Sequence, residues 1–331
     1  IDEITVPLQR FTVVTGVSGS GKSTFCREVL FENLSRRLKD AQAPLVGTDQ
    51  LTGFENVGRV LEVDQTPIGK NSRSCPATYV GIMTAIRDLY AATNEAQARG
   101  YDASRFSFNK AVGACPVCAG QGLRTVEMNF LPDVKVLCEA CAGKRFNPET
   151  LEVLWRGKSI GDVLEMEIDE AVDFFASMPS IAYPLKLMQD VGLGYLTLGQ
   201  PSPTLSGGEA QRLKLVTELA KVRTDGSFAA RAPHTLYVLD EPTVGLHMTD
   251  VNRLSKVLSR LVDAGSTVVV IEHNLDIAAD ADWIIDLGPE GGAKGGKVIA
   301  QGSPKMVARK NTATGIVLKA FLAEHKPVKS A

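Results

Sequence analysis

Two kinds of apolar pattern alternate along this chain. Short runs rich in Val, Ile and Leu that end at glycine or polar residues are typical of buried strands; they cover 11–15, 59–64, 235–239 and 267–271. Longer stretches repeat apolar residues at helical spacing; they cover 22–38, 78–97, 160–165, 169–178, 185–191 and 206–222. The alternation predicts an α/β fold built on a parallel sheet.

The first predicted strand leads directly into a G-x-x-x-x-G-K-S sequence and then into a helix. The glycines allow successive backbone N–H groups to point at phosphate oxygens, the lysine reaches the β- and γ-phosphates, and the serine offers a hydroxyl to Mg²⁺. A Gly/Ser-rich turn that matches by chance is the alternative, and the strand–loop–helix context argues against it. The predicted nucleotide-binding loop consists of Gly16, Val17, Ser18, Gly19, Ser20, Gly21, Lys22, Ser23 and Thr24.

The other predicted strands end at polar residues suited to nucleotide hydrolysis. Asp240 would hold Mg²⁺ through water, and Glu241 would deprotonate the attacking water. His273 follows the next strand and would reach the γ-phosphate, while Gln65 would sense Mg²⁺ or position the water. A lone Gln or His is more often solvated or structural. We nevertheless expect these residues to meet the nucleotide-binding loop, because parallel strands present their carboxyl ends to one crevice.

A Leu-Ser-Gly-Gly-Glu sequence at 205–209 opens another predicted helix. Ser206 can cap that helix, and Gly207 and Gly208 leave its first amides uncovered for an anion. A Ser-Gly-Gly cap by itself is unremarkable. Its place shortly before the Asp240–Glu241 pair favours a role in nucleotide binding.

Four of the six cysteines form two C-x-x-C pairs separated by 19 residues. This spacing is close to that of structural zinc sites with four thiolate ligands, which leave no open position for a substrate. Redox-active thiols are the alternative. The predicted zinc ligands are Cys115, Cys118, Cys138 and Cys141.

Basic and aromatic residues are interleaved around the cysteine pairs. In such a mixture the basic side chains can bind phosphates and the aromatic side chains can insert between bases. The candidate DNA contacts are Lys110, Arg124, Lys144 and Arg145. Acidic residues lie among them, so an ordinary solvated face is an equally good interpretation of any one position.

Overall composition gives little further guidance. The net charge of −2 provides no global case for nucleic acid, so such a surface has to be local. No apolar run approaches the 18 or so residues of a membrane span, and no signal-peptide pattern is present, which predicts a cytoplasmic protein without membrane contact. The absence of an initiator Met before Ile1 suggests a fragment of a longer chain.

The order of these motifs resembles that of ABC-type P-loop ATPases. About 140 residues separate Gln65 from Ser206, more than a transporter cassette inserts there, and the cysteine pairs lie in this interval. An ABC cassette with such an insertion resembles the UvrA family, specifically the C-terminal half of its members. Val244, Met248 and the long stretch 222–234 depart from the usual pattern, which leaves two alternatives open, the housekeeping UvrA protein and a UvrA paralogue.

The resemblance implies an ABC-type ATPase cassette with an inserted helical and zinc-binding signature subdomain. We expect an ATP-binding core at 1–78, the inserted DNA-contact module at 79–190, and the signature helix with the rest of the core at 191–331. The implied cofactors are ATP, Mg²⁺ and Zn²⁺.

The implied function is an ATP-hydrolysing DNA-damage sensor of nucleotide excision repair. Its partners would be damaged double-stranded DNA, a second cassette supplied by an N-terminal half or another copy of the chain, and UvrB through the missing half. Because signature motifs act on the nucleotide of a facing cassette, hydrolysis should be weak or absent unless the chain dimerises. The alternatives are the ATPase subunit of a transporter and a zinc-stabilised binding module with an incomplete ATP site.

Overall fold

The computed structural model describes residues 3–69, 71–126, 134–221 and 233–324. These residues divide into two compact units. Unit 1 contains 1–65 and 221–331, and unit 2 contains 66–220. Both differ from the boundaries expected from the sequence, since the helix after Ser206 belongs to unit 2 together with the cysteine pairs. The stretch 222–232, part of the argument for a paralogue, lies outside the described residues.

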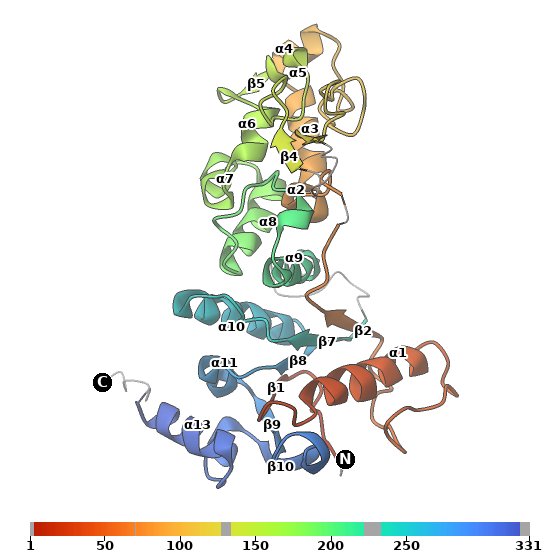
Figure 1. Ribbon diagram of the computed structural model, residues 1–331, viewed down its shortest axis with the longest axis vertical. Helices are drawn as coiled ribbons and strands as arrows, with labels where there is room; N and C mark the ends of the chain where they lie inside the picture. Colours follow the sequence, from red (N-terminus) through yellow and green to blue (C-terminus); the bar gives the residue numbers. More distant parts are fainter. Residues whose placement is uncertain (1–2, 70, 127–133, 222–232, 325–331) are drawn as a thin grey trace. The chain divides into compact units, whose positions relative to one another are not determined.

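A six-stranded sheet forms the centre of unit 1, in the order β10-β9-β1-β8-β7-β2 (Figure 1). Five strands are parallel and β10 is antiparallel to β9. The strands are β1 (Phe11–Gly16), β2 (Arg59–Val63), β7 (Thr235–Asp240), β8 (Thr267–Ile271), β9 (Trp283–Gly288) and β10 (Lys297–Gly302). The four predicted strands are confirmed, whereas β9 and β10 were not predicted.

Helices cover both faces of this sheet (Figure 1). A π-type segment, η1, packs with α1 against one face through alternate strand residues that include Val14, Val238 and Val269. The helices α10, α11 and α13 contact β1 or β8 from the other face. The bounds are η1 (Thr24–Glu32), α1 (Asn33–Arg37), α10 (Met248–Asp263), α11 (Leu275–Asp280), η3 (Gly292–Lys294), α12 (Pro304–Val307) and α13 (Ala313–Glu324).

The described part of unit 2 consists of helices of 3 to 13 residues and two small antiparallel strand pairs. The helices are α2 (Pro76–Tyr79), α3 (Ile82–Ala91), α4 (Asn94–Ala98), α5 (Pro148–Leu151), α6 (Ile160–Glu165), α7 (Ile168–Phe174), α8 (Pro179–Asp190), η2 (Ser202–Thr204) and α9 (Gly207–Leu219). The strand pairs join β3 (Leu123–Val126) with β4 (Val134–Leu137), and β5 (Leu154–Trp155) with β6 (Lys158–Ser159).

The single helix expected at 78–97 is three helices instead. Gly81, at a φ of 91°, separates α2 from α3, a backbone conformation that only glycine adopts without strain. The Thr93 hydroxyl accepts a hydrogen bond from the backbone N–H of Ala96 and thereby starts α4. The apolar periodicity was therefore read correctly, but the glycine and the capping residue determine where the helices end.

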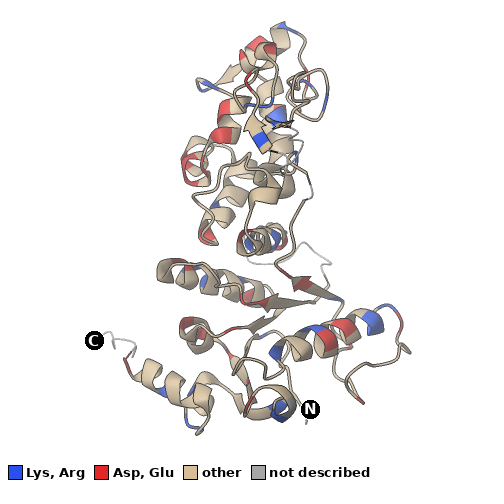
Figure 2. Ribbon diagram, viewed as in Figure 1, with Lys and Arg blue, Asp and Glu red and all other residues tan. Residues whose placement is uncertain are grey.

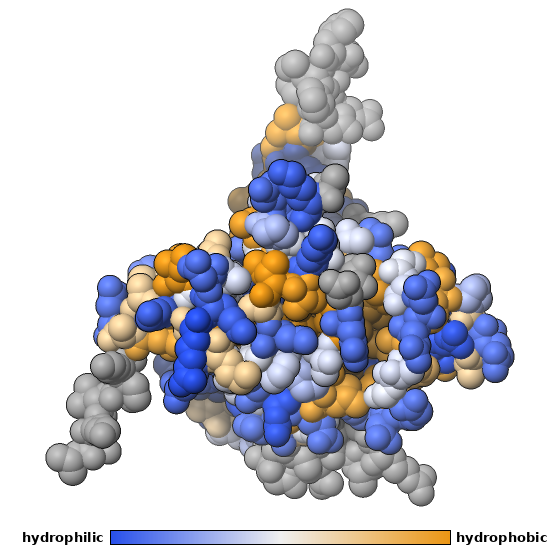
Figure 3. Space-filling model, turned by 90° about the horizontal axis from the view of Figure 1, so that it is seen from below, coloured by the Kyte–Doolittle hydropathy of each residue, from blue (hydrophilic) through white to orange (hydrophobic). Residues whose placement is uncertain are grey.

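Unit 2 carries both signs of charge, with Asp and Glu prominent along α6 and α7 (Figure 2). The face seen in Figure 3 has small apolar patches separated by hydrophilic residues. Within the described ranges, none of the helices combines the length and the hydropathy that a membrane span needs.

Candidate functional site

The loop after β1 has the backbone that a phosphate site requires. Gly16, Gly19 and Gly21 all have positive φ, and a Cβ on Gly16 would lie only 2.1 Å from the Leu287 carbonyl oxygen. The residues at the top of the loop, 17–19, are exposed, as are Ser23 and Thr24 at the start of the helix. One side of the loop thus packs against the end of β9 at Leu287, and the other side is exposed to solvent. An anion would meet the backbone N–H groups on the exposed side.

Lys22 is almost fully buried beneath this loop. Its Nζ donates to the carbonyl oxygens of Gly16 and Val17, at 3.0 Å each. Burial lowers the Lys22 pKa, and the carboxylates of Glu241, Asp240 and Asp286 oppose that shift. The lysine is therefore kept beside its own loop, in the electrostatic field of Asp240 and Glu241, which the sequence assigned to the same site, and of Asp286, which it did not.

The sheet order places the other predicted residues at the same edge of the sheet as this loop. The adjacent strands β1, β8, β7 and β2 are parallel, so their carboxyl ends lie at one edge of the sheet. These ends lead to the nucleotide-binding loop, His273, the Asp240–Glu241 pair and Gln65, respectively. Their common edge follows from strand order and direction, as the sequence predicted.

Glu241 and His273 approach each other at this edge. The Glu241 Oε1 atom lies 3.8 Å from the His273 Nε2 atom, and both side chains are about half exposed. Glu241 has a φ of 45°, which is uncommon for a residue with a side chain and accompanies the sharp turn after β7. The backbone N–H of Glu241 donates to the Ile271 carbonyl, so this turn is fixed to the end of β8.

Arg27, on the helix that follows the nucleotide-binding loop, also belongs to this sheet edge and was not predicted from the sequence. Its guanidinium contacts Glu62 at 2.6 Å and Asp240 at 3.1 Å. The contact ties the predicted Mg²⁺-associated carboxylate to the helix and to β2. A single Arg among several charged residues of one helix carries no sequence signal for such a role.

The helix at the signature sequence begins as predicted. The Ser206 side chain accepts from the Glu209 backbone N–H, and the Glu209 carboxylate accepts from the Ser206 N–H at 2.7 Å. Burial opposes ionisation of Glu209, but hydrogen bonds from the Tyr195 hydroxyl and from Ser206 outweigh it and lower its pKa. Gly207 and Gly208 are the first residues of α9, which lies in unit 2.

The four predicted zinc ligands converge in unit 2. Their sulfur atoms all lie within 4.8 Å of one another, and all four side chains are buried. The Sγ atoms of Cys118 and Cys141 are 3.7 Å apart, and tetrahedral coordination with Zn–S bonds of about 2.3 Å requires about 3.8 Å. The cluster therefore fits a zinc ion with four thiolate ligands.

The two C-x-x-C turns have the same local conformation. In each, the second cysteine is followed by Ala and Gly with positive φ, at 47° and 76° for Ala119 and Gly120 and at 46° and 84° for Ala142 and Gly143. Burial raises the pKa of the Cys118 and Cys141 thiols. A divalent cation would supply the positive charge that favours thiolates in this buried position.

The predicted DNA contact Arg145 is placed inside unit 2. It is 5% exposed, donates to the carbonyl oxygens of Ser72 and Gly199, and lies over the Phe108 ring. Its guanidinium thus joins distant segments of unit 2 and has almost no surface for DNA. This placement does not fit the predicted contact, and no sequence pattern distinguishes this arginine from the exposed basic residues around it.

The other three basic candidates are more accessible. Lys144 is partly exposed, and its amine forms an ion pair with Asp162 at 2.6 Å. Lys110 and Arg124 are exposed, and neither side chain forms an ion pair with the described residues. Among the four, these two are best placed to meet phosphates.

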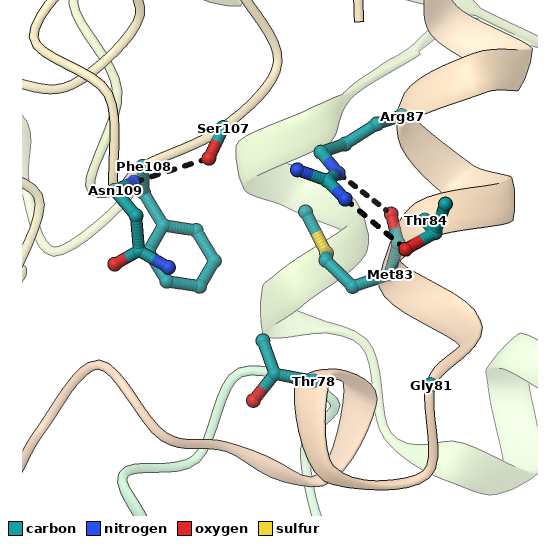
Figure 4. Close-up of a pocket in the computed structure, with 8 residues that line it drawn as sticks. All are labelled: Thr78, Gly81, Met83, Thr84, Arg87, Ser107, Phe108 and Asn109. Carbon is teal, nitrogen blue, oxygen red and sulfur yellow. Dashed lines mark hydrogen bonds between the residues drawn. The ribbon is translucent and has the colours of Figure 1, made fainter. Parts of the chain in front are cut away.

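A small cavity of about 130 Å³ lies beside the turn between α2 and α3. Figure 4 shows Thr78, Met83 and Arg87 on one side and Phe108 and Asn109 on the other. The Arg87 guanidinium donates to the Met83 carbonyl and to the Thr84 hydroxyl, so its charge is held along its own helix. The cavity contains none of the residues predicted for ATP, zinc or DNA.

Together, the parallel sheet, the loop after β1 and the inserted cysteine-containing unit define an ABC-type P-loop ATPase cassette. No family model matches the chain. UvrABC system protein A of Thermus thermophilus is 57% identical over 318 residues, which are 96% of this chain and 32% of that protein. The Aquifex aeolicus protein of the same name is 53% identical over 96% of this chain and 34% of its own length.

A solved structure agrees with these relatives. The crystal structure of UvrA2 from Deinococcus radiodurans superposes with a TM-score of 0.84 at 47% identity, covering 96% of this chain and 37% of that one. The resemblance to the UvrA family is thereby confirmed over nearly the whole chain. The chain spans about a third of the length of the curated relatives it matches, somewhat less than the half expected from the sequence.

Proposed function

We propose that this chain is the ATP-binding and zinc-binding part of a DNA-damage recognition protein of nucleotide excision repair. The observation that carries the proposal is that one chain contains both features: an ABC-type sheet edge, and a unit with four clustered cysteines inserted between Gln65 and Ser206. The 53–57% identity to UvrABC system protein A favours this combination over a transporter ATPase.

In the proposed reaction the chain binds and hydrolyses ATP with Mg²⁺. The loop from Gly16 to Thr24 holds the phosphates, and Lys22 leaves its carbonyl partners to pair with the β- and γ-phosphates. Ser23 and Asp240 would hold Mg²⁺, which would neutralise phosphate charge; Glu241 takes the proton of the attacking water, and His273 contacts the γ-phosphate. Gln65 orients the water or the metal from the end of β2.

A facing cassette completes the ATP site in this proposal. Ser206, Gly207 and Gly208 present a capped helix N-terminus suited to the nucleotide of a partner cassette. The partner is a second copy of the chain or an N-terminal cassette of a longer protein, and UvrB binds through segments beyond this chain. Turnover by an isolated monomer is accordingly weak or absent.

Unit 2 provides the DNA contacts in this proposal. Zn²⁺ bound by Cys115, Cys118, Cys138 and Cys141 fixes the two turns, and Lys110 and Arg124 lie near these turns in the sequence with exposed side chains. Lys144 contributes at most a partial charge to phosphate, because Asp162 already neutralises it. Arg145 acts as a structural residue.

The decisive experiment measures binding to a duplex carrying one bulky base adduct and to the same duplex without it, each with and without ATP. We expect preference for the damaged duplex and a change in affinity when ATP is added. Lys22→Ala, which removes the phosphate charge, should abolish the ATP effect while leaving DNA binding without nucleotide unchanged. Equal affinity for both duplexes in all conditions would refute the proposal.

A second candidate function is a zinc-stabilised binding module that does not hydrolyse ATP. It is favoured by the presence of one nucleotide-binding loop and one signature sequence in the chain, because a signature sequence acts on the nucleotide of a facing cassette. ATP turnover measured over a range of protein concentrations separates the two. Turnover per chain that rises with concentration supports the dimerising ATPase, and zero turnover with intact DNA binding supports the module.

A further inference from the structure

Glu272 is a buried acidic residue for which the proposed reaction has no role. It lies directly after β8 and before His273, and it is 2% exposed. A buried carboxylate is unfavourable unless hydrogen bonds compensate for its lost hydration. The contacts that stabilise Glu272 therefore indicate what it does.

Within the described part of the chain, all the hydrogen bonds to this carboxylate come from backbone N–H groups of two loops. Oε1 accepts from the N–H of Thr243 at 2.9 Å. Oε2 accepts from the N–H groups of His273 at 2.9 Å and Asn274 at 3.1 Å. One side chain thus joins the turn that follows the Asp240–Glu241 pair to the turn that carries His273.

The backbone of Glu272 extends this connection to a third strand. Its N–H donates to the Val14 carbonyl at 3.2 Å, two residues before the nucleotide-binding loop begins at Gly16. Glu272 is therefore attached to the ends of β1, β7 and β8. Bonds between a charged acceptor and N–H groups are stronger than those between neutral groups, so the connection is stiff.

Neighbouring contacts show why this position matters for Glu241 and His273. Asn274 is held by Glu272 and itself caps α11 by accepting from the N–H groups of Asp276 and Ile277. The left-handed backbone of Glu241 is followed two residues later by Thr243, the other end of the connection. Only 3.8 Å separates Glu241 Oε1 from His273 Nε2, a distance that depends on both turns.

We propose that Glu272 is a positioning residue that holds Glu241 and His273 in register for ATP hydrolysis, without touching the nucleotide. The inference rests on the proposed ATPase function. Misplacement of a reacting group by about 1 Å can lower a rate by about 10²-fold. Loss of the connection should therefore reduce turnover strongly, while the phosphate loop still binds ATP.

The test compares kcat and the ATP dissociation constant of Glu272→Gln with those of the parent, in the same protein preparation in which parent turnover is measured. Gln keeps the length of the side chain but replaces one acceptor oxygen with an NH₂ group. That group is a donor, so it cannot accept the backbone N–H bonds in one of the two turns. We expect kcat to fall about 10–10²-fold with ATP affinity unchanged. Asp282→Asn is the matched control, because Asp282 accepts from the Phe11 N–H at the other end of β1; its kcat should not change.

Two further measurements separate positioning from stability. Glu272→Asp keeps both acceptor oxygens on a shorter stem, so a folded protein with reduced kcat is expected even if Glu272→Gln does not fold. Combined with His273→Ala, Glu272→Gln should cost less than the product of the two single losses, because the two residues act together. A general loss of stability would give the full product.

The outcomes distinguish this inference from the proposed function. If folded Glu272→Gln or Glu272→Asp turns over at the parent rate, Glu272 is a structural residue and the inference is wrong. If the parent shows no turnover above that of Glu241→Gln at any protein concentration, including those at which it dimerises, the proposed ATPase function fails instead.

Discussion

The two units of this protein hold their candidate sites in different ways. In unit 1, the residues expected to meet ATP lie on turns after buried parallel strands, and backbone hydrogen bonds such as that from Glu241 to Ile271 fix the turns. In unit 2, the described strands are short and mostly exposed, and four cysteine side chains from two turns converge on one point. The register of the sheet determines where the predicted ATP-site residues of unit 1 lie. A metal ion is expected to determine where the two cysteine turns of unit 2 lie.

The largest effect should come from removing the zinc ligands. Replacing both cysteines of one pair, as in Cys138→Ser/Cys141→Ser, should abolish metal binding and unfold the region around the turns, since structural zinc is worth about 10 kcal/mol or more of apparent folding free energy. Elemental analysis should find one zinc per chain in the parent and none in the variant. ATP binding by unit 1 should persist.

A matched control for that variant is Cys75→Ser, because Cys75 caps α2 outside the cluster and Ser is a good capping residue. It should retain one zinc per chain. Loss of ATP binding together with zinc in the cluster variant would show that the two units depend on each other for folding, contrary to the comparison drawn above.

The next largest effect should be on catalysis in unit 1. Glu241→Gln keeps the shape of the side chain but removes its basicity, so ATP turnover should fall about 10²–10⁴-fold while ATP affinity and zinc content stay unchanged. Glu290→Gln is a suitable control, since Glu290 is exposed and pairs with Lys294 on a loop of the same unit. Parent-level turnover in Glu241→Gln would show that another group activates water.

A smaller effect is expected for DNA binding by unit 2. The variant Lys110→Ala/Arg124→Ala should weaken binding and lower the slope of log affinity against log salt by about two units, one for each lost phosphate contact. The control is Lys158→Ala/Lys186→Ala, which makes the same charge change on residues of β6 and α8. An equal change of slope in both variants would indicate a nonspecific charge effect.

The features predicted from sequence are those in which short motifs determine local geometry. The nucleotide-binding loop, the Ser206 cap and the cysteine turns were recognisable because glycine, serine and cysteine have restricted roles at such spacings. Strands β1, β2, β7 and β8 were recognised from their apolar runs. The polar and glycine-rich flanks of β9 and β10 concealed those strands; β9 pairs with β1, which is distant in sequence, and β10 is an edge strand that pairs only with β9 among the described strands.

The features that were missed depend on contacts between distant segments. Arg145 is buried because it bonds to carbonyl groups 73 and 54 residues away. Arg27 contacts Asp240 across the sheet edge, and Glu272 reaches a turn 29 residues earlier in the chain. Composition and periodicity contain no information about such pairings, so charged residues in particular were assigned to solvent or to ligands.

The smallest predicted effect concerns Lys144, whose ion pair makes it part of the framework of unit 2. Hydrogen bonds from Lys144 and Ser159 outweigh burial and lower the Asp162 pKa below its ordinary value of 3.8. The pKa of Asp162 is therefore lower in the folded state than in the unfolded state. Its contribution to the free energy of unfolding is fully present above the unfolded-state pKa and is lost as the pH falls through the folded-state pKa. A double-mutant cycle with Lys144→Ala and Asp162→Asn should give a coupling of about 0.2–1 kcal/mol in urea unfolding, because both groups are partly exposed. This coupling should be equal at pH 6 and pH 8.

Lys144→Ala should also change the salt slope for DNA by less than Arg124→Ala does; a full unit of change would assign Lys144 to the DNA contact instead of to the framework.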